Sequence, residues 1–242
     1  MLCDVTFDRQ FNSIVNLKHY PWIGKGYLSA PVKLLILGDS HYTVDNDGMF
    51  SLEEYNRCIN DKNYTRDTLN CAVGTDDAWS FYKGLYDLLS ISPYEAEQKL
   101  WDKVVFYNFV QTPMQQRDAT PTEYDFKEAW FCLLDVIDII QPSLCLFIGT
   151  RGWVSNGYIN LENRGTCNIK YDKRISGCYP WKADILTKAG ICSHALAIHH
   201  TSQGFSPTIW REYIRENAPS IFEILDTSES NNNELSRVTD CD

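Results

Sequence analysis

Four reactive side chains stand directly after a short apolar run near the start of the chain. The run covers residues 34–37 and ends at Gly38, and an acid, a hydroxyl, an imidazole and a phenol follow it: Asp39, Ser40, His41 and Tyr42. A continuous apolar run closed by glycine is typical of a strand buried on both faces of a parallel sheet. Because ligands of open α/β sheets bind just beyond the carboxyl ends of such strands, these side chains predict a catalytic or binding site. The alternative is a capped turn in which Asp39 or Ser40 only bonds backbone amides.

Polar side chains also accompany the ends of two later apolar runs. Asn108 lies near the end of one of them, and His199 and His200 follow another. Since the carboxyl ends of parallel strands meet at one edge of a sheet, we expect Asp39, Asn108 and His200 to line one site. Neighbouring residues of an extended strand point to opposite sides, so the two histidines do not readily share one ion and we predict no metal site. Of the pair, we assign His200 to the site.

Apolar runs alternate along the chain with helical patterns. The runs cover residues 34–37, 104–110, 144–148 and 194–198, and the helical patterns cover 79–91, 120–140 and 207–225, with a weaker one at 7–17. This alternation predicts a three-layer α/β/α fold around a central, mostly parallel, four-stranded sheet. Thr120 as N-cap, Pro121 and Glu123 mark the start of the middle helix. Residues 43–77 and 153–190 are predicted to be irregular.

Size and composition fit one domain. With 242 residues and 44% hydrophobic content the chain can bury one α/β core, which we assign to residues 1–225, and the acidic, asparagine-rich residues 226–242 are predicted to be a flexible tail. Without an export signal or a long apolar stretch, the sequence predicts a cytoplasmic, intracellular protein with no membrane contact. Nine scattered cysteines without a C-x-x-C pair suggest neither a disulfide framework nor a zinc ribbon. No glycine-rich phosphate loop follows an apolar run, which disfavours nucleotide cofactors.

The charge distribution contains one local exception. A net charge of −10 argues against loose, sequence-independent affinity for nucleic acid, which depends on cations that neutralise phosphates. Residues 164–182, however, carry five cations against Asp172 alone, with aromatic residues between them: Arg164, Lys170, Lys173, Arg174 and Lys182, with Tyr171, Tyr179 and Trp181. Such a segment suits binding to a nucleic-acid backbone, and a solvated loop is the alternative interpretation.

The order and spacing of four motifs carry a family resemblance. The motifs are GDSHY at 38–42, YNFVQTPMQQRDATPTEYD at 107–125, QPSLCLFIGTRGW at 141–153 and HHTSQGF at 199–205. Together they resemble the uracil-DNA glycosylase superfamily, particularly its thermophile-type branch, with a first-strand acidic motif, a second-strand Asn and a late His-x-Ser. The resemblance covers roughly residues 33–210, and the segment 108–123 is its most specific part.

The resemblance implies a role for each matching residue. Asp39 would position or activate the attacking water, Asn108 would bond the base edge, and His200 would stabilise negative charge on the departing base. Ser202 would lie near a DNA phosphate, Phe50 would stack on the extruded base, and Phe205 would belong to the loop pushed into the duplex. The full expected set is catalytic Asp39, His200 and Ser40; substrate-binding Asn108, Phe50, His41, Tyr42 and His199; and DNA-binding Ser202, Phe205, Lys173 and Arg174.

Several positions depart from the family pattern. His41 and Tyr42 replace Pro-Gly or Pro-Tyr, and Thr201 replaces Pro, so we expect a different pocket floor. Thr112 stands where the thermophile-type branch has a cluster-ligating Cys, and the amino-terminal cysteine pair is missing, so we predict no iron–sulfur cluster and no other cofactor. The resemblance then implies an enzyme that releases uracil or a modified pyrimidine from DNA, acting on a single strand or on a base flipped from a duplex. The sequence does not define the oligomeric state, and we expect a monomer.

Two other functions remain open from the sequence. GDS after a first strand also resembles the nucleophile motif of SGNH-type esterases, with Ser40 as nucleophile and a late His as base. That family has an Asp three residues before the late His, where this chain has Leu196 or Ala197, and no G-x-N-D follows. The second is a non-catalytic module that binds a nucleobase or nucleic acid on the same fold.

Overall fold

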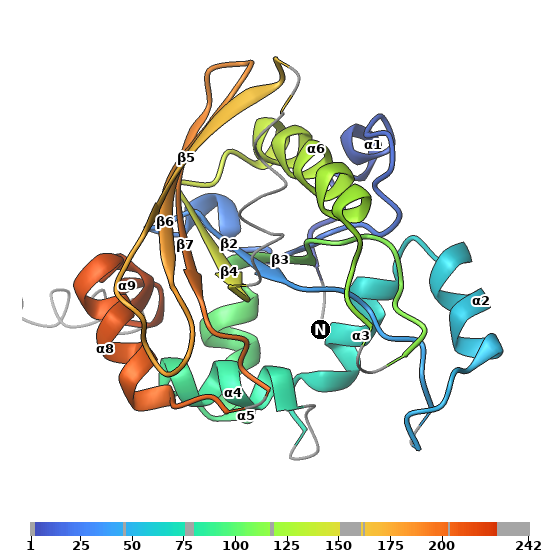
Figure 1. Cartoon of the computed structure of the whole chain (residues 1–242), viewed down its shortest axis with the longest axis horizontal. Helices are drawn as coiled ribbons and strands as arrows, with labels where there is room; N and C mark the ends of the chain where they lie inside the picture. The colour runs from blue at the N-terminus through green and yellow to red at the C-terminus, as the bar shows by residue number, and fades with distance from the viewer. Residues whose placement is uncertain are drawn as a thin grey trace, which may run out of the picture.

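A single mixed sheet forms the centre of the molecule. The computed structural model describes residues 3–45, 47–75, 80–116, 119–150, 161, 163–202 and 204–226. Within them, seven strands pair in the order β1-β3-β2-β4-β7-β6-β5 (Figure 1). Their bounds are Trp22–Ile23 for β1, Leu34–Gly38 for β2, Val104–Asn108 for β3, Leu144–Ile148 for β4, Gly165–Tyr171 for β5, Trp181–Thr187 for β6 and Cys192–Ile198 for β7.

The four predicted strands are the parallel part of this sheet. β3, β2, β4 and β7 lie side by side and all run in the same direction. Three antiparallel strands extend them: β1 pairs with β3, β6 with β7, and β5 with β6. The α/β class is therefore confirmed, whereas the prediction of a four-stranded sheet is wrong because the sheet has seven strands.

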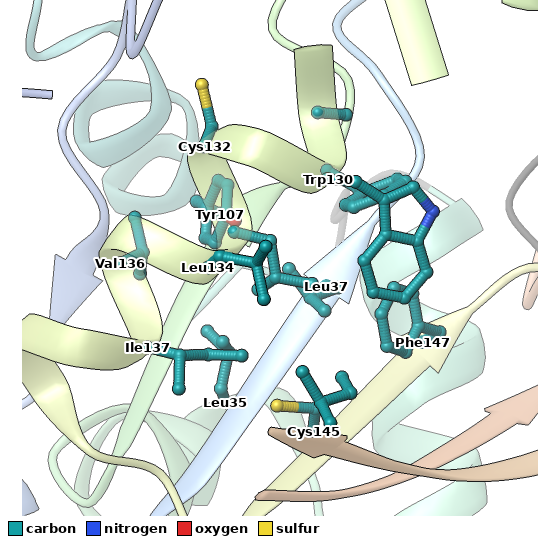
Figure 2. Packing of buried hydrophobic residues seen from close by; sticks show 14 of the residues in the cluster. Leu35, Leu37, Tyr107, Trp130, Cys132, Leu134, Val136, Ile137, Cys145 and Phe147 are labelled. Atoms are coloured by element: carbon teal, nitrogen blue, oxygen red, sulfur yellow. The ribbon is translucent and has the colours of Figure 1, made fainter. Parts of the chain in front are cut away.

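Helices α1 (Asp8–Phe11) and α6 (Glu123–Ile140) cover one face of the sheet. Alternate residues of the parallel strands point to this face, as expected for the two-residue period of a strand. Figure 2 shows Trp130, Leu134 and Ile137 of α6 lying over Leu35 and Leu37 of β2, with β4 beside them. Burial of this kind contributes about 1.5–3 kcal/mol for each large apolar side chain.

The other face is covered by a larger group of helices. Its core includes Leu34, Ile36 and Phe106 from the sheet, packed against side chains of α3, α4, α8 and α9. The bounds are Tyr64–Ala72 for α3, Ser80–Leu89 for α4, Pro93–Ala96 for α5, Glu97–Trp101 for η2, Pro207–Asn217 for α8 and Ser220–Asp226 for α9. Two faces covered by helices give the three layers that the sequence predicts.

Several predicted boundaries need correction. The stretch 43–77, predicted to be irregular, contains α2 (Leu52–Asn60) and α3, and 153–190 contains β5 and β6. The middle helix begins at Glu123, because Thr122 rather than Thr120 is its N-cap and forms a capping box with Asp125. The pattern 207–225 divides into α8 and α9, and 7–17 holds only the four residues of α1.

The carboxyl-terminal segment lies mostly beyond what the structure describes. Asp226, assigned above to the tail, is the last residue of α9, and the rest of the predicted tail, 227–242, lies outside the described residues. In the described part of the chain, we find no helix that combines the length and the apolar character needed to span a bilayer.

Candidate active site

Asp39 and Asn108 lie at adjacent strand ends. Gly38 and Asn108 are partners in the register of β2 and β3. The pairing continues beyond the strands, since the N–H groups of Phe109 and Val110 donate to the carbonyls of Gly38 and Asp39, both at 2.9 Å. Asp39 and Asn108 are each 8% exposed. The backbones of Asp39 and Asn108 are thus held next to each other at the strand ends and cannot shift without breaking these hydrogen bonds.

The Asn108 amide lies directly against the backbone of Gly38. A Cβ at position 38 would come within 2.1 Å of Asn108 Oδ1 and 3.4 Å of the Phe106 ring. The closing glycine of the motif is therefore required by space rather than by backbone conformation. The buried Gln111 side chain adds a further restraint, because its Nε2 donates to the Asn108 carbonyl at 2.7 Å.

His200 approaches the same edge from β7. In the sheet order β2-β4-β7, the strand that ends at Ile198 lies two positions from β2, which corresponds to about 10 Å at the usual strand spacing. The Ser202 N–H donates to His200 Nδ1 at 3.2 Å, and Ser202 Oγ lies 2.7 Å from the same nitrogen. Because a backbone N–H can only donate, Nδ1 is the acceptor and the neutral ring carries its proton on Nε2. His200 is thereby oriented as a hydrogen-bond donor.

Helix α4 fixes the loop that carries His200. Thr201 is 4% exposed, and its Oγ1 donates to the Phe81 carbonyl at 2.7 Å. One turn along α4, a Cβ at Gly84 would come within 2.3 Å of the Thr201 carbonyl oxygen, so the loop and the helix pack backbone against backbone. The Phe81 ring lies 5.5 Å from the His200 ring and 5.9 Å from that of Phe106, between the ends of β7 and β3. Phe81 was assigned only to a core-facing helix by its spacing, and no motif marks it as part of a site.

His41 is held by α3 behind the strand ends. Its Nε2 lies 2.8 Å from Thr65 Oγ1, and its ring meets Tyr64 edge-on at 4.8 Å and His19 at 5.2 Å. Burial, with a smaller contribution from the neighbouring His19, holds the pKa of His41 well below its usual value. A neutral, enclosed imidazole of this kind ties the GDSHY loop to α3. Sequence reasoning missed this contact, because His19, Tyr64 and Thr65 belong to no motif.

Other predicted site residues have structural neighbours as well. The ring of His199 packs near Phe205 and Trp210, at 6.3 and 6.2 Å, and its Nδ1 donates to the His200 carbonyl at 2.7 Å. His199 and Phe205 therefore lie on the side of α8. Ser202 was predicted to lie near a DNA phosphate, but its N–H and its hydroxyl both contact His200 Nδ1.

Three further predicted site residues, Ser40, Tyr42 and Phe50, occupy different environments. Ser40 is 9% exposed, and its Oγ finds no hydrogen-bond partner among the described residues. Tyr42 is half-buried and forms a parallel bridge with Met114. Phe50 is 44% exposed and packs its ring 5.7 Å from that of Tyr55, close to the antiparallel bridge between Val44 and Phe50. Only Phe50 of these has a substantially exposed side chain.

The basic segment is divided by the antiparallel pairing. Tyr171 pairs with Trp181, and Trp181 with Ala197, so residues 172–180 lie at the edge where β7 ends. Arg164 lies at the opposite edge, 3.8 Å from Asp135. Lys173 and Arg174 therefore share an edge with the candidate site, whereas the other end of the segment does not.

A surface cavity of about 470 Å³ lies elsewhere, between the ends of α4, η2, α8 and α9. Its lining residues are Leu89, Ser90, Ile91, Lys99, Arg215, Pro219, Phe222 and Leu225. None of them follows a parallel strand, so we do not associate this cavity with the motifs. Residues 151–160, which follow β4 in the sequence, are outside the part of the chain that the structure describes.

The described residues also contain no cluster of three or more His, Cys, Asp or Glu side chains that could hold a metal ion. No protein-family model matches the chain, and no curated protein matches it. Inference about function therefore depends on the motifs and on the geometry of this sheet edge.

Proposed function

We propose that this protein is a DNA glycosylase that hydrolyses the N-glycosidic bond of uracil or a modified pyrimidine. The observation that carries the proposal is the row of groups along one sheet edge. Asp39 and Asn108 follow adjacent strands, and His200, with its proton on Nε2, follows a strand about 10 Å away. That span of sheet edge is comparable to the size of a nucleotide base with its sugar.

The chemistry of the bond matches these groups. Breakage of an N-glycosidic bond leaves an anionic base and a cationic sugar, and the transition state carries part of both charges. A carboxylate such as Asp39 stabilises the sugar cation and orients a water molecule toward it. A fixed N–H donor such as His200 Nε2 stabilises the base anion, a type of contact worth about 10²–10³ in rate.

Asn108 supports selectivity for a pyrimidine. Its side-chain amide presents one acceptor and two donors, which is the complement of a base edge that offers both a carbonyl and an N–H. Because the amide is 8% exposed and lies against Gly38, it has little freedom to reorient. A rigid amide rejects a base whose edge leaves its polar atoms unpaired.

The geometry gives less support to an esterase. A serine nucleophile requires an imidazole within hydrogen-bonding distance. In the described parts of the chain, no imidazole lies within that distance of Ser40 Oγ, and the neighbouring His41 bonds Thr65 instead. His200 directs Nδ1 to Ser202.

Base release from synthetic oligonucleotides tests the proposal. The substrates carry uracil or one of several modified pyrimidines, in single-stranded and duplex form, and Asp39→Asn, Asn108→Ala and Ser40→Ala are compared with wild type. His194→Ala is the control for a substitution away from the site, since this exposed histidine lies near the start of β7, whereas His200 follows its end, and it pairs with Asp184 of β6. We expect release of at least one base by wild type and the control, and loss in Asp39→Asn.

Two results would overturn the proposal. Binding of DNA without release of any base would identify a binding module. Ester hydrolysis that is lost in Ser40→Ala but retained in Asn108→Ala would identify an esterase.

A further inference from the structure

The turn between β5 and β6 lies at the same sheet edge as the candidate site. In the register, Tyr171 pairs with Trp181 and Trp181 with Ala197, so the chain continues past the sheet at 172–180 on one side and at 199–202 on the other. In Figure 1 the orange turn that joins β5 to β6 reaches the same end of the sheet as the orange-red chain that leaves β7. β6 adjoins β7 and β5 follows it, so the two arms of the turn lie one and two strand spacings, or about 5 and 10 Å, from that chain along the sheet.

This turn, residues 172–180, is a rigid hairpin tip. Ile175 and Cys178 exchange backbone hydrogen bonds of 2.8 and 2.9 Å around Ser176 and Gly177, whose φ angles are 46° and 88°. Two successive positive φ angles define the tight two-residue turn that suits the twist of a β-hairpin. The Ile175 and Cys178 side chains pack against the helical core. The tip therefore keeps its shape before any ligand arrives.

An ion pair within the hairpin and a hydrogen bond from α8 both involve Asp172. Asp172 lies 3.0 Å from Lys182 Nζ and accepts a 2.6 Å hydrogen bond from the Tyr213 hydroxyl. Desolvation opposes ionisation of Asp172, but the bonds from Tyr213 and Lys182 outweigh it, and its pKa is lowered. Lys182 thus neutralises Asp172, which is the one acid of the basic segment. Asp172 therefore does not cancel the positive charges of Lys173 and Arg174.

Cations and aromatic rings alternate on the exposed part of the tip. Lys173 and Arg174 are exposed, and no carboxylate of the described residues forms an ion pair with either. Tyr171 and Tyr179 are 55% and 56% exposed, and the Arg174 guanidinium lies 5.9 Å from the Tyr179 ring centre. Surfaces that bind single-stranded nucleic acid combine two components: aromatic rings on which bases stack, and cations that pair with the phosphates.

We infer that the hairpin tip binds single-stranded DNA beside the nucleotide that enters the site, an inference that rests on the proposed function. Stacking on Tyr179 needs a base whose face is exposed, which a duplex does not offer. Two cations neutralise about two phosphates, and the net charge of −10 opposes a longer contact. The offset of about 5–10 Å corresponds to roughly one to three nucleotides at a phosphate spacing of about 3.4 Å. The substrate class is therefore a single strand with unpaired bases next to the target.

Binding measurements test this inference independently of catalysis. Fluorescence anisotropy is measured with a labelled single-stranded DNA without a target base, its duplex and an RNA of the same sequence. The variants are Lys173→Ala with Arg174→Ala, and Tyr179→Ala. The matched control is Arg164→Ala with Lys188→Ala. These two residues lie beside each other at the end of β5 and β6 that is farthest from the tip, where the Lys188 N–H donates to the Arg164 carbonyl at 2.9 Å.

We expect single-stranded DNA to bind most tightly, with Kd raised about tenfold or more by either hairpin variant and unchanged in the control. The slope of log Kd against log salt should be about 1.4 in wild type, at about 0.7 for each neutralised phosphate, and should fall toward zero in the double variant. Equal binding by wild type and both hairpin variants, or tighter binding of duplex or RNA, would overturn the inference.

The two proposals fail in different ways. If the hairpin variants lose affinity but no oligonucleotide ever loses a base, the glycosylase proposal fails while the binding surface stands. If bases are released and the hairpin variants keep both Kd and KM, only the hairpin inference fails. If both hold, the variants raise KM and leave kcat unchanged.

Discussion

Two histidines that each follow a parallel strand have different surroundings. His41 follows β2 and is 6% exposed, with its ring bonded to Thr65 and its pKa lowered by burial. His200 follows β7 and is only half-buried, with Nδ1 held by Ser202 and the proton of the neutral ring on Nε2. The two residues thus have the same side chain and the same position after a parallel strand. The helix that contacts each ring determines how the ring is used. α3 encloses His41, whereas α4 supports His200 through the tilted ring of Phe81.

The largest expected effect separates the two rings by activity. Under the proposed function, replacement His200→Ala removes the donor to the base anion, and we expect the rate of base release to fall by about 10²–10³-fold. The melting temperature should stay within a few degrees, because the half-buried ring adds little to the core. Single-turnover kinetics on the preferred oligonucleotide measure the rate. A loss of stability without a loss of rate would reverse the assignment, and His194→Ala is the control.

The second effect separates them by stability. Replacement His41→Ala leaves a cavity between Tyr64 and His19 and an unpaired Thr65 hydroxyl, so the free energy of unfolding should fall by about 2–4 kcal/mol. Urea denaturation followed by fluorescence measures it. Thr65→Val, which removes only the hydroxyl, should lower stability less. Unchanged stability in His41→Ala would show that the ring is not a structural contact.

The third effect is a dependence of stability on pH. The pKa values of His41 and His19 are lowered in the folded protein, mainly by burial, so below pH 6.5 the unfolded chain binds more protons than the native one. The free energy of unfolding should therefore fall as pH drops below about 6.5, by about 1 kcal/mol per pH unit for each histidine, with no contribution above it. Urea titrations between pH 5 and 8 measure this slope. It should be shallower in His41→Ala, and an identical slope in both proteins would contradict the neutral state of the ring.

The smallest effect concerns the orientation of His200. Ser202→Ala removes the hydroxyl 2.7 Å from Nδ1 but keeps the backbone N–H, so we expect base release to fall by about tenfold, at the low end for a residue that orients another. The pH profile of kcat should shift as well, because the hydroxyl influences which nitrogen is protonated. Ser202→Thr, which retains the hydroxyl, should restore most of the rate. A variant with wild-type rate and profile would remove Ser202 from the site.

The sequence predicts the parallel strands well because their apolar runs are continuous. β5 and β6 were missed for the opposite reason. Along β6 the buried residues Trp181, Ala183 and Ile185 alternate with Lys182 and Asp184, and the charges were interpreted as a loop. In antiparallel strands beside solvent, charge and extended structure occur together.

Helix α3 was missed because half of its buried residues are polar. It buries Thr65, Arg66 and Thr68, and the Arg66 guanidinium bonds Asp8 at 2.6 and 2.9 Å. The spacing of apolar residues does not reveal a helix of this kind, because polar side chains occupy buried positions and form hydrogen bonds and an ion pair there. The enclosure of His41 depends on this same helix, so it was also beyond the reach of a sequence pattern.

The start of α6 shows a different limit. Thr120 with Glu123 and Thr122 with Asp125 both have the spacing of a capping box, and the structure uses the second. Local chemistry permits either register, and only the packing of the helix on the sheet selects one. The candidate site itself was predictable in part: the edge of Asp39, Asn108 and His200 follows from strand order, whereas the Phe81 and Ser202 contacts do not.

The backbone contact between Gly84 and Thr201 has a mechanical consequence. Since α4 meets the post-β7 loop with no side chain between them, any tilt of the helix carries the imidazole of His200 with it. The clearance between that ring and the strand ends of β2 and β3 is then set by how α4 rests on the sheet. Residues that never meet a substrate would determine which bases are small enough to be accommodated.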